Sequence, residues 1–546
     1  AWGLILVEVG ILDHFFLSRG RLCPKLYVLS QNSHKMQGNQ LLNILLLYPE
    51  MPNSFWSMQH TLKIIGKAAW YPPLGLATVA ALLPEDWTKR LVDLNVEPLV
   101  DEDMVWADYV FLSAMNVQEK SVWEIIDRCN KLGVKIVAGG SLFTIEHSRF
   151  SGIDHFVLNE AEITLPLFLS DLEAGNLKKT YSANEYSDAQ LTPPPQWDLI
   201  DFKKYQYGIV QYSRGCPYRC DFCDVPLLYG NRPRTKSSDQ IIAELNLFIK
   251  ESTVPTVLFA DDNLIGDRKA LKDDLLPALI QWRRKHVPIF SFSTQVSINL
   301  ADDPELMSLM LEAGFRHLFI GIETEDESTL AESKKWQNTK RNLLDNISKL
   351  HQMGFIVVGG FIVGFDTDTP ETFKKQTELI QNSGILMATV NMLKAPPGTP
   401  LYERLKSEDR LVPDFSFAEF QTNIKPVMTS EKLYQGFDEM IRKIYGPEFG
   451  VARTKKWLSE FNHLPDVVVD IPGLNPLEYL PVFFRAIYFI GIKYSGRRHF
   501  WRLIFWAVRH HFRKVDWALV NLILIYQLHH LQMDYSAALS REPSSE

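Results

Sequence analysis

The sequence has few cysteines, no excess of positive charge and no apolar run that matches a membrane span. Five cysteines in 546 residues, three of them clustered, do not suggest a disulfide framework. The formal net charge of −8 argues against a general nucleic-acid binder, because such proteins are usually basic. Residues 1–17 are apolar but contain Glu8, Asp13 and His14, and they match neither a signal peptide nor a membrane-spanning helix.

What remains is the composition of a globular protein with substantial cores. Hydrophobic residues make up 46% of the chain and charged residues 22%. The length predicts about three domains. The first methionine is Met36. We therefore expect residues 1–35 to be an upstream extension or a fragment artefact and the working protein to begin near Met36. The whole stretch 1–40 precedes the first predicted domain.

The densest chemical signal is the stretch 213–223, which contains Cys216, Cys220 and Cys223. Thiolates at such short spacing select iron–sulfur clusters or zinc. A structural zinc site would have four ligands, but Cys129 lies 87 residues upstream of the trio and Cys23 lies near the N-terminus. Three thiolates leave one coordination position open, and an open position is typical of a catalytic metal site rather than a structural one. A zinc knuckle or a chance cluster is the alternative.

This spacing, with the aromatic Phe222 before the last cysteine, resembles the signature loop of radical S-adenosylmethionine (SAM) enzymes. The resemblance implies that Cys216, Cys220 and Cys223 hold a [4Fe–4S] cluster and that SAM binds its fourth iron. It also implies that an electron from the cluster cleaves SAM to a 5′-deoxyadenosyl radical. The resemblance further implies an external electron donor of the flavodoxin or ferredoxin type. A cluster of this kind needs a reducing compartment, so we expect a cytoplasmic protein.

Upstream of this loop, apolar runs of strand length alternate with helical segments. This alternation predicts an α/β domain with a parallel sheet covered on both faces. In helix 122–132, Trp123, Ile126 and Cys129 are spaced to share one face. The predicted strands are 42–48, 89–95, 109–115, 135–140 and 155–158, and the predicted helices are 74–83 and 122–132. Ligands of such sheets bind at the carboxyl ends of the strands, which here carry Asp93, Asn95, Ser113, Gly139 and Gly140.

A Rossmann-like domain ahead of such a loop resembles the cobalamin-binding domain of B12-dependent radical SAM enzymes. The matching features are Tyr-Pro-Pro-Leu-Gly at 71–75, Ser113, Gly139-Gly140, and Asn-Glu-Ala-Glu at 159–162, where many relatives read Gly-Glu-Gly-Glu. The resemblance implies cobalamin contacts at Asp93, Asn95, Ser113, Gly139 and Gly140. Cobalamin domains of the methionine-synthase type read Asp-x-His-x-x-Gly, but residues 93–98 read Asp-Leu-Asn-Val-Glu-Pro. The lower ligand of cobalt is therefore left open, and a sheet domain without a ligand is the alternative.

After the stiff Pro193-Pro194-Pro195 linker, the alternation of strands and helices resumes. Six strand–helix units are too few to close an eight-stranded barrel. We therefore expect an open, partial (β/α)6 barrel, which the radical SAM resemblance also implies. The predicted strands are 207–212, 256–260, 289–294, 317–322, 355–363 and 387–393, and the helices are 239–250, 269–285, 304–312, 339–352 and 371–383.

Polar residues that follow these strands are candidates for SAM contacts, because sites in such barrels lie at the strand carboxyl ends. Asp261-Asp262-Asn263 follow the second strand and offer acceptors for the SAM ammonium group. They stand where the family more often has Gly-Gly-Glu, so the resemblance implies this role for Asp262 and Asn263. Arg234 and Lys236 are equally compatible with the SAM carboxylate and with capping a loop.

Three further SAM contacts are implied by the resemblance. Glu323 falls where relatives place a ribose contact, and a carboxylate accepts hydrogen bonds from hydroxyls. Gly360 and Gly364 resemble the glycine motif beside adenine. Thr367 stands where the family often has an acidic residue, with Asp366 and Asp368 on either side. A helix cap or a solvated loop is the alternative for each carboxylate.

The C-terminal region shows no strand alternation and predicts helices over 433–445, 453–461, 480–492 and 500–531. From Lys493 to Lys514 there are seven basic residues and no acidic one, interleaved with aromatics. This pattern is compatible with a helical lid that has a basic outer face, or with a helix at a membrane surface. The later run 517–528 is too short to span a bilayer. The pairs 510–511 and 529–530 are adjacent histidines without the partners of a metal site.

This region resembles a C-terminal domain of unknown function found in many B12-binding radical SAM proteins, hopanoid methylases among them. The domains expected are therefore a Rossmann-like B12-binding domain over 41–185, a linker over 186–200, a radical SAM barrel over 201–415 and a helical domain over 416–546. The resemblance implies a cobalamin-dependent radical SAM methyltransferase acting on an unactivated carbon of a small or lipid-like substrate. Cyclisation, oxidation or rearrangement with the same cofactors is the second interpretation, and a non-catalytic cobalamin sensor is the third. No protein acid or base is predicted.

Overall fold

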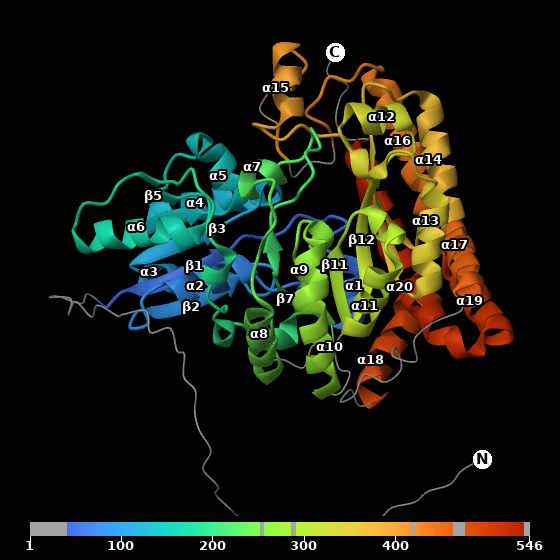
Figure 1. The fold of residues 1–546 in the computed structure, drawn as a ribbon, viewed down its shortest axis with the longest axis horizontal. Helices are drawn as coiled ribbons and strands as arrows, with labels where there is room; N and C mark the ends of the chain where they lie inside the picture. Colours follow the sequence, from blue (N-terminus) through green and yellow to red (C-terminus); the bar gives the residue numbers. More distant parts are fainter. Residues whose placement is uncertain are drawn as a thin grey trace, which may run out of the picture. The chain divides into compact units, whose positions relative to one another are not determined.

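The computed structural model describes residues 41–251, 256–285, 291–413, 415–417, 421–461 and 476–539 (Figure 1). The predicted extension over 1–40 and Cys23 lie outside the described residues. Leu42–Glu546 form one compact unit. The predicted division of this stretch into domains stays a prediction.

The first half of the fold is a parallel sheet of six strands in the order β2-β1-β3-β4-β5-β6. Each strand predicted before residue 160 is present. The two-residue β6 at the edge was not predicted. The strands are β1 (Asn43–Tyr48), β2 (Thr88–Asp93), β3 (Tyr109–Ser113), β4 (Lys135–Gly139), β5 (His155–Val157) and β6 (Thr180–Tyr181).

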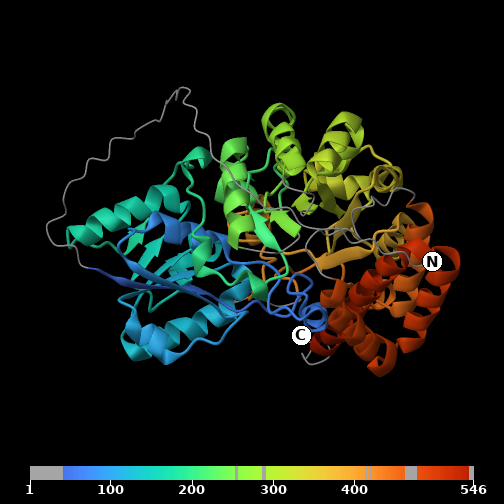
Figure 2. The ribbon, with the colours of Figure 1, turned by 90° about the horizontal axis from the view of Figure 1, so that it is seen from below.

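Helices bury both faces of this sheet, which explains why its strands read as apolar runs rather than alternating ones (Figure 2). On one face lie α3 (Asp101–Trp106), α4 (Glu119–Leu132) and α5 (Ser141–Glu146). On the other lie α2 (Leu74–Leu82) and α6 (Ala161–Glu173).

The predicted buried face of α4 is wrong in one position. Ile126 and Cys129 are buried, but Trp123 is exposed and stacks on Phe150 at 4.8 Å between ring centroids. The buried stripe is Val122, Ile125, Ile126 and Cys129. The tryptophan lies at the margin of this stripe, because three apolar positions define the rotation of a helix only loosely.

The second half is another parallel sheet, whose six strands follow chain order in space, β7-β10-β11-β12-β13-β14. No pairing joins β7 to β14 in the described part of the chain, so the sheet is open, as six strand–helix units predict. The predicted residues 289–290 lie outside the described ranges. The strands are β7 (Gly208–Val210), β10 (Thr256–Phe259), β11 (Ser291–Gln295), β12 (Phe315–Glu323), β13 (Ile356–Val363) and β14 (Met387–Met392).

The two faces of this sheet have different surroundings. Leu318, Ile320 and Ile322 of β12 point to the helices and are fully buried, whereas the alternate residues Phe319 and Gly321 face inward and are only partly buried. The inner face is therefore the accessible one. The covering helices are α8 (Ser238–Glu251), α10 (Leu276–Lys285), α11 (Pro304–Ala313), α13 (Leu343–Met353) and α14 (Pro370–Ser383).

Helix α13 begins four residues later than predicted. Asn342 caps its N-terminus by accepting a hydrogen bond from the Asp345 N–H group. The residues before it form a short 3₁₀ turn, Trp336–Asn338, which contributes to the candidate site described below.

The C-terminal region is helical, as predicted, but the predicted helix 500–531 is two helices that break at His511. No helix in the described ranges is long and apolar enough to cross a membrane. The helices are α15 (Pro400–Ser407), α16 (Ser430–Ile444), α17 (Pro447–Glu460), α18 (Pro476–Ala486) with the π-helical turn η11 (Ile487–Lys493), α19 (Arg497–His510) and α20 (Val515–Leu539).

Gly140 provides a test of the first sheet. Its φ of +91° is open only to glycine, and a Cβ there would lie 2.8 Å from the Ala114 carbonyl oxygen and from Ser113 Oγ. We predict that Gly140→Ala lowers the free energy of unfolding by at least about 1–3 kcal/mol, measured by urea denaturation. The matched control is Gly75→Ala in α2, where a Cβ meets nothing within 4 Å. That change should stabilise the protein by about 0.5–1 kcal/mol. Equal effects would contradict the prediction.

Candidate functional site

The three clustered cysteines lie on a loop framed by a short antiparallel ribbon, β8 (Ser213–Arg214) and β9 (Arg234–Thr235). Gly215 begins the loop with a φ of +92°. A Cβ at this glycine would lie 2.9–3.0 Å from the carbonyl oxygens of Tyr229, Gly230 and Arg232, so no side chain fits. The Cys216 N–H group donates to Gly230 O, which fixes the start of the cysteine run against the end of α7 (Val225–Tyr229).

All three cysteines are free thiols; Cys220 is buried, and Cys216 and Cys223 are partly buried. Burial raises the pKa of each thiol, whereas the positive charge of Lys335 acts on all three in the opposite direction. The Gln337 Nε2 group lies 3.7 Å from Cys220 Sγ as a hydrogen-bond donor. In the described residues, no three His, Cys, Asp or Glu side chains converge on a single metal ion. A [4Fe–4S] cubane offers a separate iron to each thiolate, so three thiolates that do not share one metal ion fit such a cluster.

A buried ion pair lies beside the thiols. Lys335 Nζ is 2.6 Å from Glu323 Oε1, and the two side chains are 12% and 9% exposed. Burial alone would lower the pKa of Lys335, but Glu323 and the Cys220 and Cys223 sulfurs raise it above its ordinary value. Gly321 makes this pair sterically feasible, because a Cβ there would lie 2.4 Å from Glu323 Oε1 and 2.9 Å from Lys335 Nζ.

The strand end that carries Glu323 is held by Asn338 from the 3₁₀ turn. The Asn338 Nδ2 group donates to the carbonyl oxygens of Gly321 and Ile322, each at 2.9 Å. Glu323 itself has a φ of +63°, a left-handed conformation that is uncommon outside glycine. These contacts turn the carboxylate at the end of β12 toward the cysteine loop.

The acidic run after β10 is engaged with its neighbours in the structure. Asp261 is fully buried and accepts hydrogen bonds from the Tyr212 N–H and from the Ser213 N–H and Oγ groups. Asp262 accepts from the Gly215 N–H at 3.2 Å, so it contacts the cysteine loop directly. Asn263 exchanges two hydrogen bonds with Ser297. The roles of Asp262 and Asn263 toward SAM stay predictions.

The glycines predicted beside adenine lie on and after β13. A Cβ at Gly360 would lie 2.8 Å from the Phe319 ring, so this glycine leaves room for an inward-facing aromatic. Gly364 has a φ of +100°, and its N–H group donates to Asp368 Oδ2 at 2.7 Å. Phe222 contacts Phe365 edge to face at 6.1 Å, which joins the cysteine loop to this segment.

The residues flanking Thr367 have structural partners. Asp366 forms ion pairs with Arg404 and Arg410, at 2.8 Å and 2.6 Å. Asp368 accepts from two backbone N–H groups, and its other carboxylate oxygen is buried without a partner. Burial raises the pKa of Asp368 to about 6.

Arg234 and Lys236 are both engaged in buried ion pairs. Lys236 pairs with Glu244 at 2.5 Å. Arg234 pairs with Glu160 at 2.9 Å, and Arg214 of the cysteine loop pairs with the same carboxylate at 2.9 Å. Both side chains thus have structural partners, and a contact of either with the SAM carboxylate stays a prediction.

The residues predicted to contact cobalamin all lie at the carboxyl edge of the first sheet. Asp93 accepts hydrogen bonds from the Tyr205 hydroxyl at 2.9 Å and from the backbone and side chain of Asn95. A Cβ at Gly139 would lie 2.7 Å from the Val157 carbonyl oxygen, and one at Gly140 would lie 2.8 Å from Ser113 Oγ. The glycines thus allow close packing inside the sheet itself. Their contact with a cofactor stays a prediction.

One loop of the first sheet reaches the inner face of the second. It follows β1 and places Trp56 edge to face against Phe319, with ring centroids 5.1 Å apart. Trp56 remains 47% exposed. Other side chains of this inner face lack partners: Ser293 Oγ and His317 Nδ1 are buried without a hydrogen bond.

Sequence reasoning missed Lys335, Gln337 and Trp56. The segment 333–338 reads Ser-Lys-Lys-Trp-Gln-Asn, and its two lysines before a tryptophan were the available signal. Nothing local in the sequence indicates that Trp56 meets Phe319, since 263 positions separate them.

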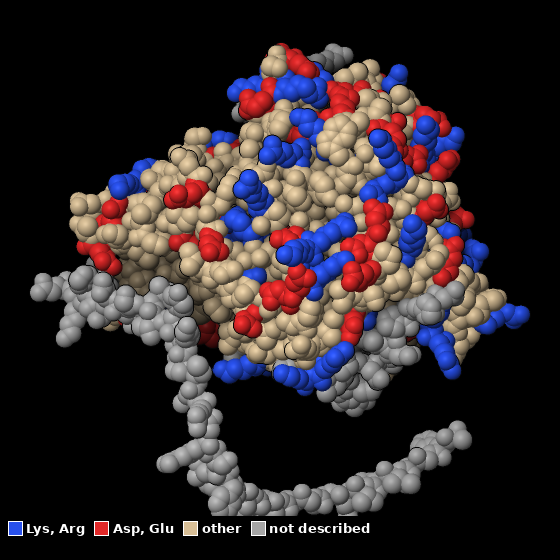
Figure 3. Space-filling model, viewed as in Figure 1, with Lys and Arg blue, Asp and Glu red and all other residues tan. Residues whose placement is uncertain are grey.

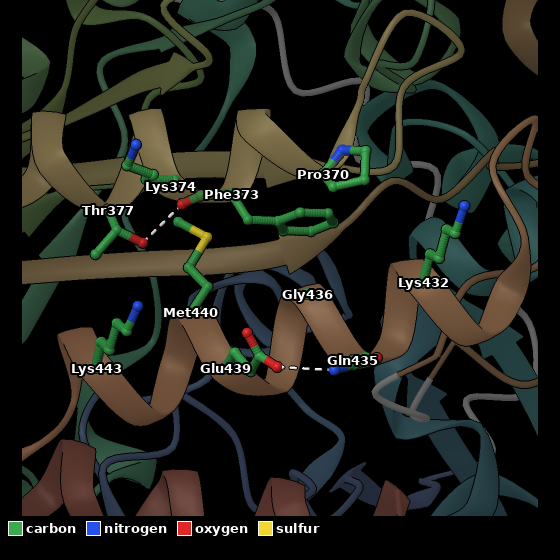
Figure 4. A pocket seen from close by; sticks show the side chains of 10 residues that line it. All are labelled: Pro370, Phe373, Lys374, Thr377, Lys432, Gln435, Gly436, Glu439, Met440 and Lys443. Carbon is green, nitrogen blue, oxygen red and sulfur yellow. Dashed lines mark hydrogen bonds between the residues drawn. The ribbon is translucent and has the colours of Figure 1, made fainter.

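A groove lies elsewhere, between α14 and α16 (Figure 4). It has a volume of about 320 Å³, and Lys374, Lys432 and Lys443 stand around it. Gly436 on its wall lets Phe373 pack closely against α16, since a Cβ there would lie 2.5 Å from the Phe373 ring. None of the predicted site residues lines it, so we do not assign it to the reaction.

The Glu323–Lys335 pair is testable in the iron-free protein. Glu323→Gln or Lys335→Met leaves one buried charge without its partner, which costs about 3–5 kcal/mol. We predict that the double variant loses clearly less stability than the sum of the two single variants, as measured by urea and thermal unfolding. The exposed pair Glu371–Lys374, 3.2 Å apart, is the control and should show no measurable coupling. Additive losses at Glu323 and Lys335 would contradict the pairing.

Asp368 predicts a pH dependence of stability. Its folded-state pKa of about 6 exceeds the ordinary 3.8, so the folded protein binds this proton more tightly than the unfolded chain. The stability that the protonated Asp368 carboxyl group contributes is fully present below about pH 4 and is lost as the pH rises through about 6. Asp368→Asn carries no charge and keeps an oxygen for the Gly364 and Phe365 N–H groups. It should raise the free energy of unfolding at about pH 8 by up to about 3 kcal/mol, and leave it unchanged at about pH 4.

Asp366→Asn is the matched control for this pH series, measured by urea unfolding. Burial would raise the pKa of Asp366, but the hydrogen bonds from Arg410 and Arg404 hold it below its usual value. The control should therefore destabilise the protein at about pH 8 and lose its effect at acid pH. Destabilisation by both variants at about pH 8 would contradict the assignment for Asp368.

The chain is similar to known proteins in sequence and in fold. The pattern of the radical SAM superfamily matches residues 210–380, and a domain of unknown function, DUF4070, matches residues 399–540. Among solved structures, the fold is similar to the cobalamin-dependent SAM radical enzyme OxsB, with a TM-score of 0.59 at 15% identity, covering 92% of this chain and 81% of that one. It is also similar to the methyltransferase TsrM from Kitasatospora setae, with a TM-score of 0.51 at 15% identity, covering 67% and 76%.

Curated relatives match over nearly the whole length. An uncharacterised methyltransferase of Synechocystis sp. is 36% identical over 86% of this chain and 88% of its own length. The hopanoid C-2 methylase of Rhodopseudomonas palustris is 32% identical over 92% of this chain and 95% of its own. This chain belongs to the radical SAM superfamily, in the family of methyltransferases that includes the hopanoid C-2 methylase.

Proposed function

We propose that this protein is a cobalamin-dependent radical SAM enzyme that methylates an unactivated carbon of a small, apolar or lipid-like substrate. The observation that carries the proposal is the contact between Trp56 and Phe319. This contact brings the carboxyl edge of the first sheet, where parallel sheets bind ligands, to the inner face of the second sheet.

Cys216, Cys220 and Cys223 would hold the [4Fe–4S] cluster that membership of the superfamily implies. Asp262, Asn263, Glu323, Gly360, Gly364 and Phe222 are the residues proposed to surround SAM. With both bound, the cluster and SAM supply one-electron chemistry that activates a carbon–hydrogen bond. The chain itself contributes Lys335, whose buried positive charge lies beside all three thiols and stabilises their anionic form.

Cobalamin would bind at the carboxyl edge of the first sheet, beside Asp93, Asn95, Ser113, Gly139 and Gly140. Two apolar side chains that follow strands at this edge, Trp56 and Met115, are 47% and 38% exposed. Exposed apolar groups at the edge of a sheet favour a large, flat partner over solvent. OxsB and TsrM, whose folds are similar, have been solved with cobalamin bound.

The inner face of the second sheet supports an apolar substrate. Its partly buried residues include Leu258, Val358, Ile362 and Met387. Polar side chains share this face, among them Ser293, Gln295, His317 and Asn391. Apolar side chains bind the apolar body of a molecule, and polar groups among them fix its orientation. The relative from Rhodopseudomonas palustris is named for methylating a hopanoid.

The proposal is tested by anaerobic reconstitution of the purified protein with iron, sulfide and a corrinoid, followed by assay with SAM labelled in its methyl group against a cell extract. We predict about four irons and one corrinoid per chain, and transfer of the label to an organic product. Cys220→Ala should lose iron and transfer while it keeps the corrinoid, because the two cofactors are proposed to bind to different sheets. Gly140→Ala should do the reverse: it should lose the corrinoid while it keeps the iron, because Gly140 lies on the sheet proposed to bind cobalamin.

Each other result has a definite meaning. 5′-Deoxyadenosine without transfer of the label would replace methylation by cyclisation, oxidation or rearrangement. A protein that binds a corrinoid but no iron would be a sensor. Failure to bind any corrinoid would overturn the cobalamin part of the proposal. Unchanged iron content in Cys220→Ala would overturn the assignment of the cluster ligands.

A further inference from the structure

The helices α18 and α19 present apolar side chains to solvent rather than to the core. On α18 and η11, Leu480, Phe484, Tyr488 and Ile492 recur at every fourth position and are 44–62% exposed. A soluble helix normally turns such a stripe inward. Here the inward contacts come from other positions of the same segment, such as Ala486 and Ile490, and the outer stripe stays exposed.

Helix α19 repeats this arrangement and adds charge. Its outward apolar residues are Trp501, Phe505 and Val508, which are 37–66% exposed. At about 100° per residue they span an arc of about 60°, and the basic residues Arg498, Arg502 and Arg509 span an adjacent arc of about 40°. Beyond the end of α19, Phe512 is 75% exposed and Arg513 is also exposed.

The two stripes form one continuous surface, which we call the α18–α19 face. Trp501 joins them, because its Nε1 group donates to Gly491 O at 2.9 Å. Its ring also stacks on Phe505 at 5.9 Å between centroids. Gly491 permits this approach, since a Cβ there would lie 3.1–3.3 Å from the rings of Phe500 and Trp501.

The charge of this face differs from that of the rest of the chain. Residues 480–514 contain eight Lys or Arg and no Asp or Glu, in a protein with a net charge of −8. On the side of the molecule in Figure 3, blue and red side chains are interspersed. Six of the eight basic residues are exposed, namely Lys493, Arg497, Arg498, Arg502, Arg509 and Arg513.

We propose that the α18–α19 face binds the surface of an anionic lipid bilayer. Aromatic and aliphatic side chains enter the interfacial region, and the flanking arginines contact the lipid phosphates. Since no described helix crosses a membrane, α18 and α19 lie in the interface plane. A second copy of the chain is a poorer occupant, because a two-fold contact would oppose the same basic residues across the interface.

The proposal is independent of catalysis and is tested with vesicles. The full-length protein is sedimented with sucrose-loaded vesicles of phosphatidylglycerol and phosphatidylcholine in equal parts, and with vesicles of phosphatidylcholine alone. We expect binding to the anionic vesicles that weakens with salt, and at least about tenfold weaker binding to the neutral ones. Two triple variants, Phe484→Ser/Phe505→Ser/Phe512→Ser and Arg498→Glu/Arg502→Glu/Arg509→Glu, should each lose at least about tenfold in binding to the anionic vesicles.

The controls change exposed residues elsewhere, three charged residues in one variant and a single apolar residue in the other. Lys374→Glu/Lys432→Glu/Lys443→Glu reverses three charges around the groove of Figure 4, and Val105→Ser removes an exposed apolar group from α3. Both should bind the anionic vesicles as the unaltered protein does. Circular dichroism and light scattering confirm folding and oligomeric state. Failure of the unaltered protein to bind, equal loss in the lysine control, or a dimer that only the α18–α19 variants dissociate would overturn the proposal.

Discussion

The position of the cysteine loop depends on a buried network of charges that joins the two sheets. Arg214, one residue after the start of the ribbon that carries the loop, pairs with Glu160 and Glu162 at the beginning of α6. Arg234 from the opposite strand of the ribbon pairs with Glu160. Both carboxylates are nearly inaccessible, with 3–4% of each side chain exposed. Burial alone would raise the pKa of Glu162, but the hydrogen bond and the charge of Arg214 hold it below its ordinary value, so this carboxylate is ionised at neutral pH.

Such a network favours one arrangement of its partners more than it adds to stability. Bringing four charges out of water is costly, and the arginine forks recover that cost only in a narrow range of geometries. A small displacement of the ribbon relative to α6 would leave a buried carboxylate without its partner. The loop that holds the thiols is therefore fixed relative to the first sheet as well as to its own sheet. The chemistry proposed above, between two cofactors on different sheets, would require such precision, because misplacement of reacting groups by about 1 Å is costly.

The sequence predicted the strands well and the roles of single polar residues less well. Buried parallel strands such as β1 and β3 are continuous apolar runs between breakers, and this signal is local. Strand β6 has two residues and leaves no such signal. Asp261 and Arg234 were recognisable as polar residues beside strand ends, but the sequence does not say which side of a loop faces the interior. Asp261 proved to hold the backbone of Ser213, and Arg234 proved to pair with Glu160.

The candidate site shows the same division between local and distant information. The three cysteines lie within eight residues, so their spacing is visible in the sequence. Lys335 lies near the thiols because Asn338 anchors the turn that follows it to the end of β12. Trp56 reaches Phe319 through the packing of one sheet against the other. Contacts between positions so far apart are set by the whole topology, which a single sequence does not display.

The last helix has a consequence for how far the chain can be shortened. Gln527 of α20 accepts a hydrogen bond from the buried Thr61 N–H group, and Asp534 accepts one from Asn53. These partners flank the loop that carries Trp56, so residues near the end of the chain support the residue that links the two sheets. The C-terminal helices are thus not an appendage that could be trimmed to yield a minimal catalyst. A truncated chain would keep the cysteine loop and the strands, but it would lose the hydrogen bonds that hold the loop carrying Trp56 against Phe319.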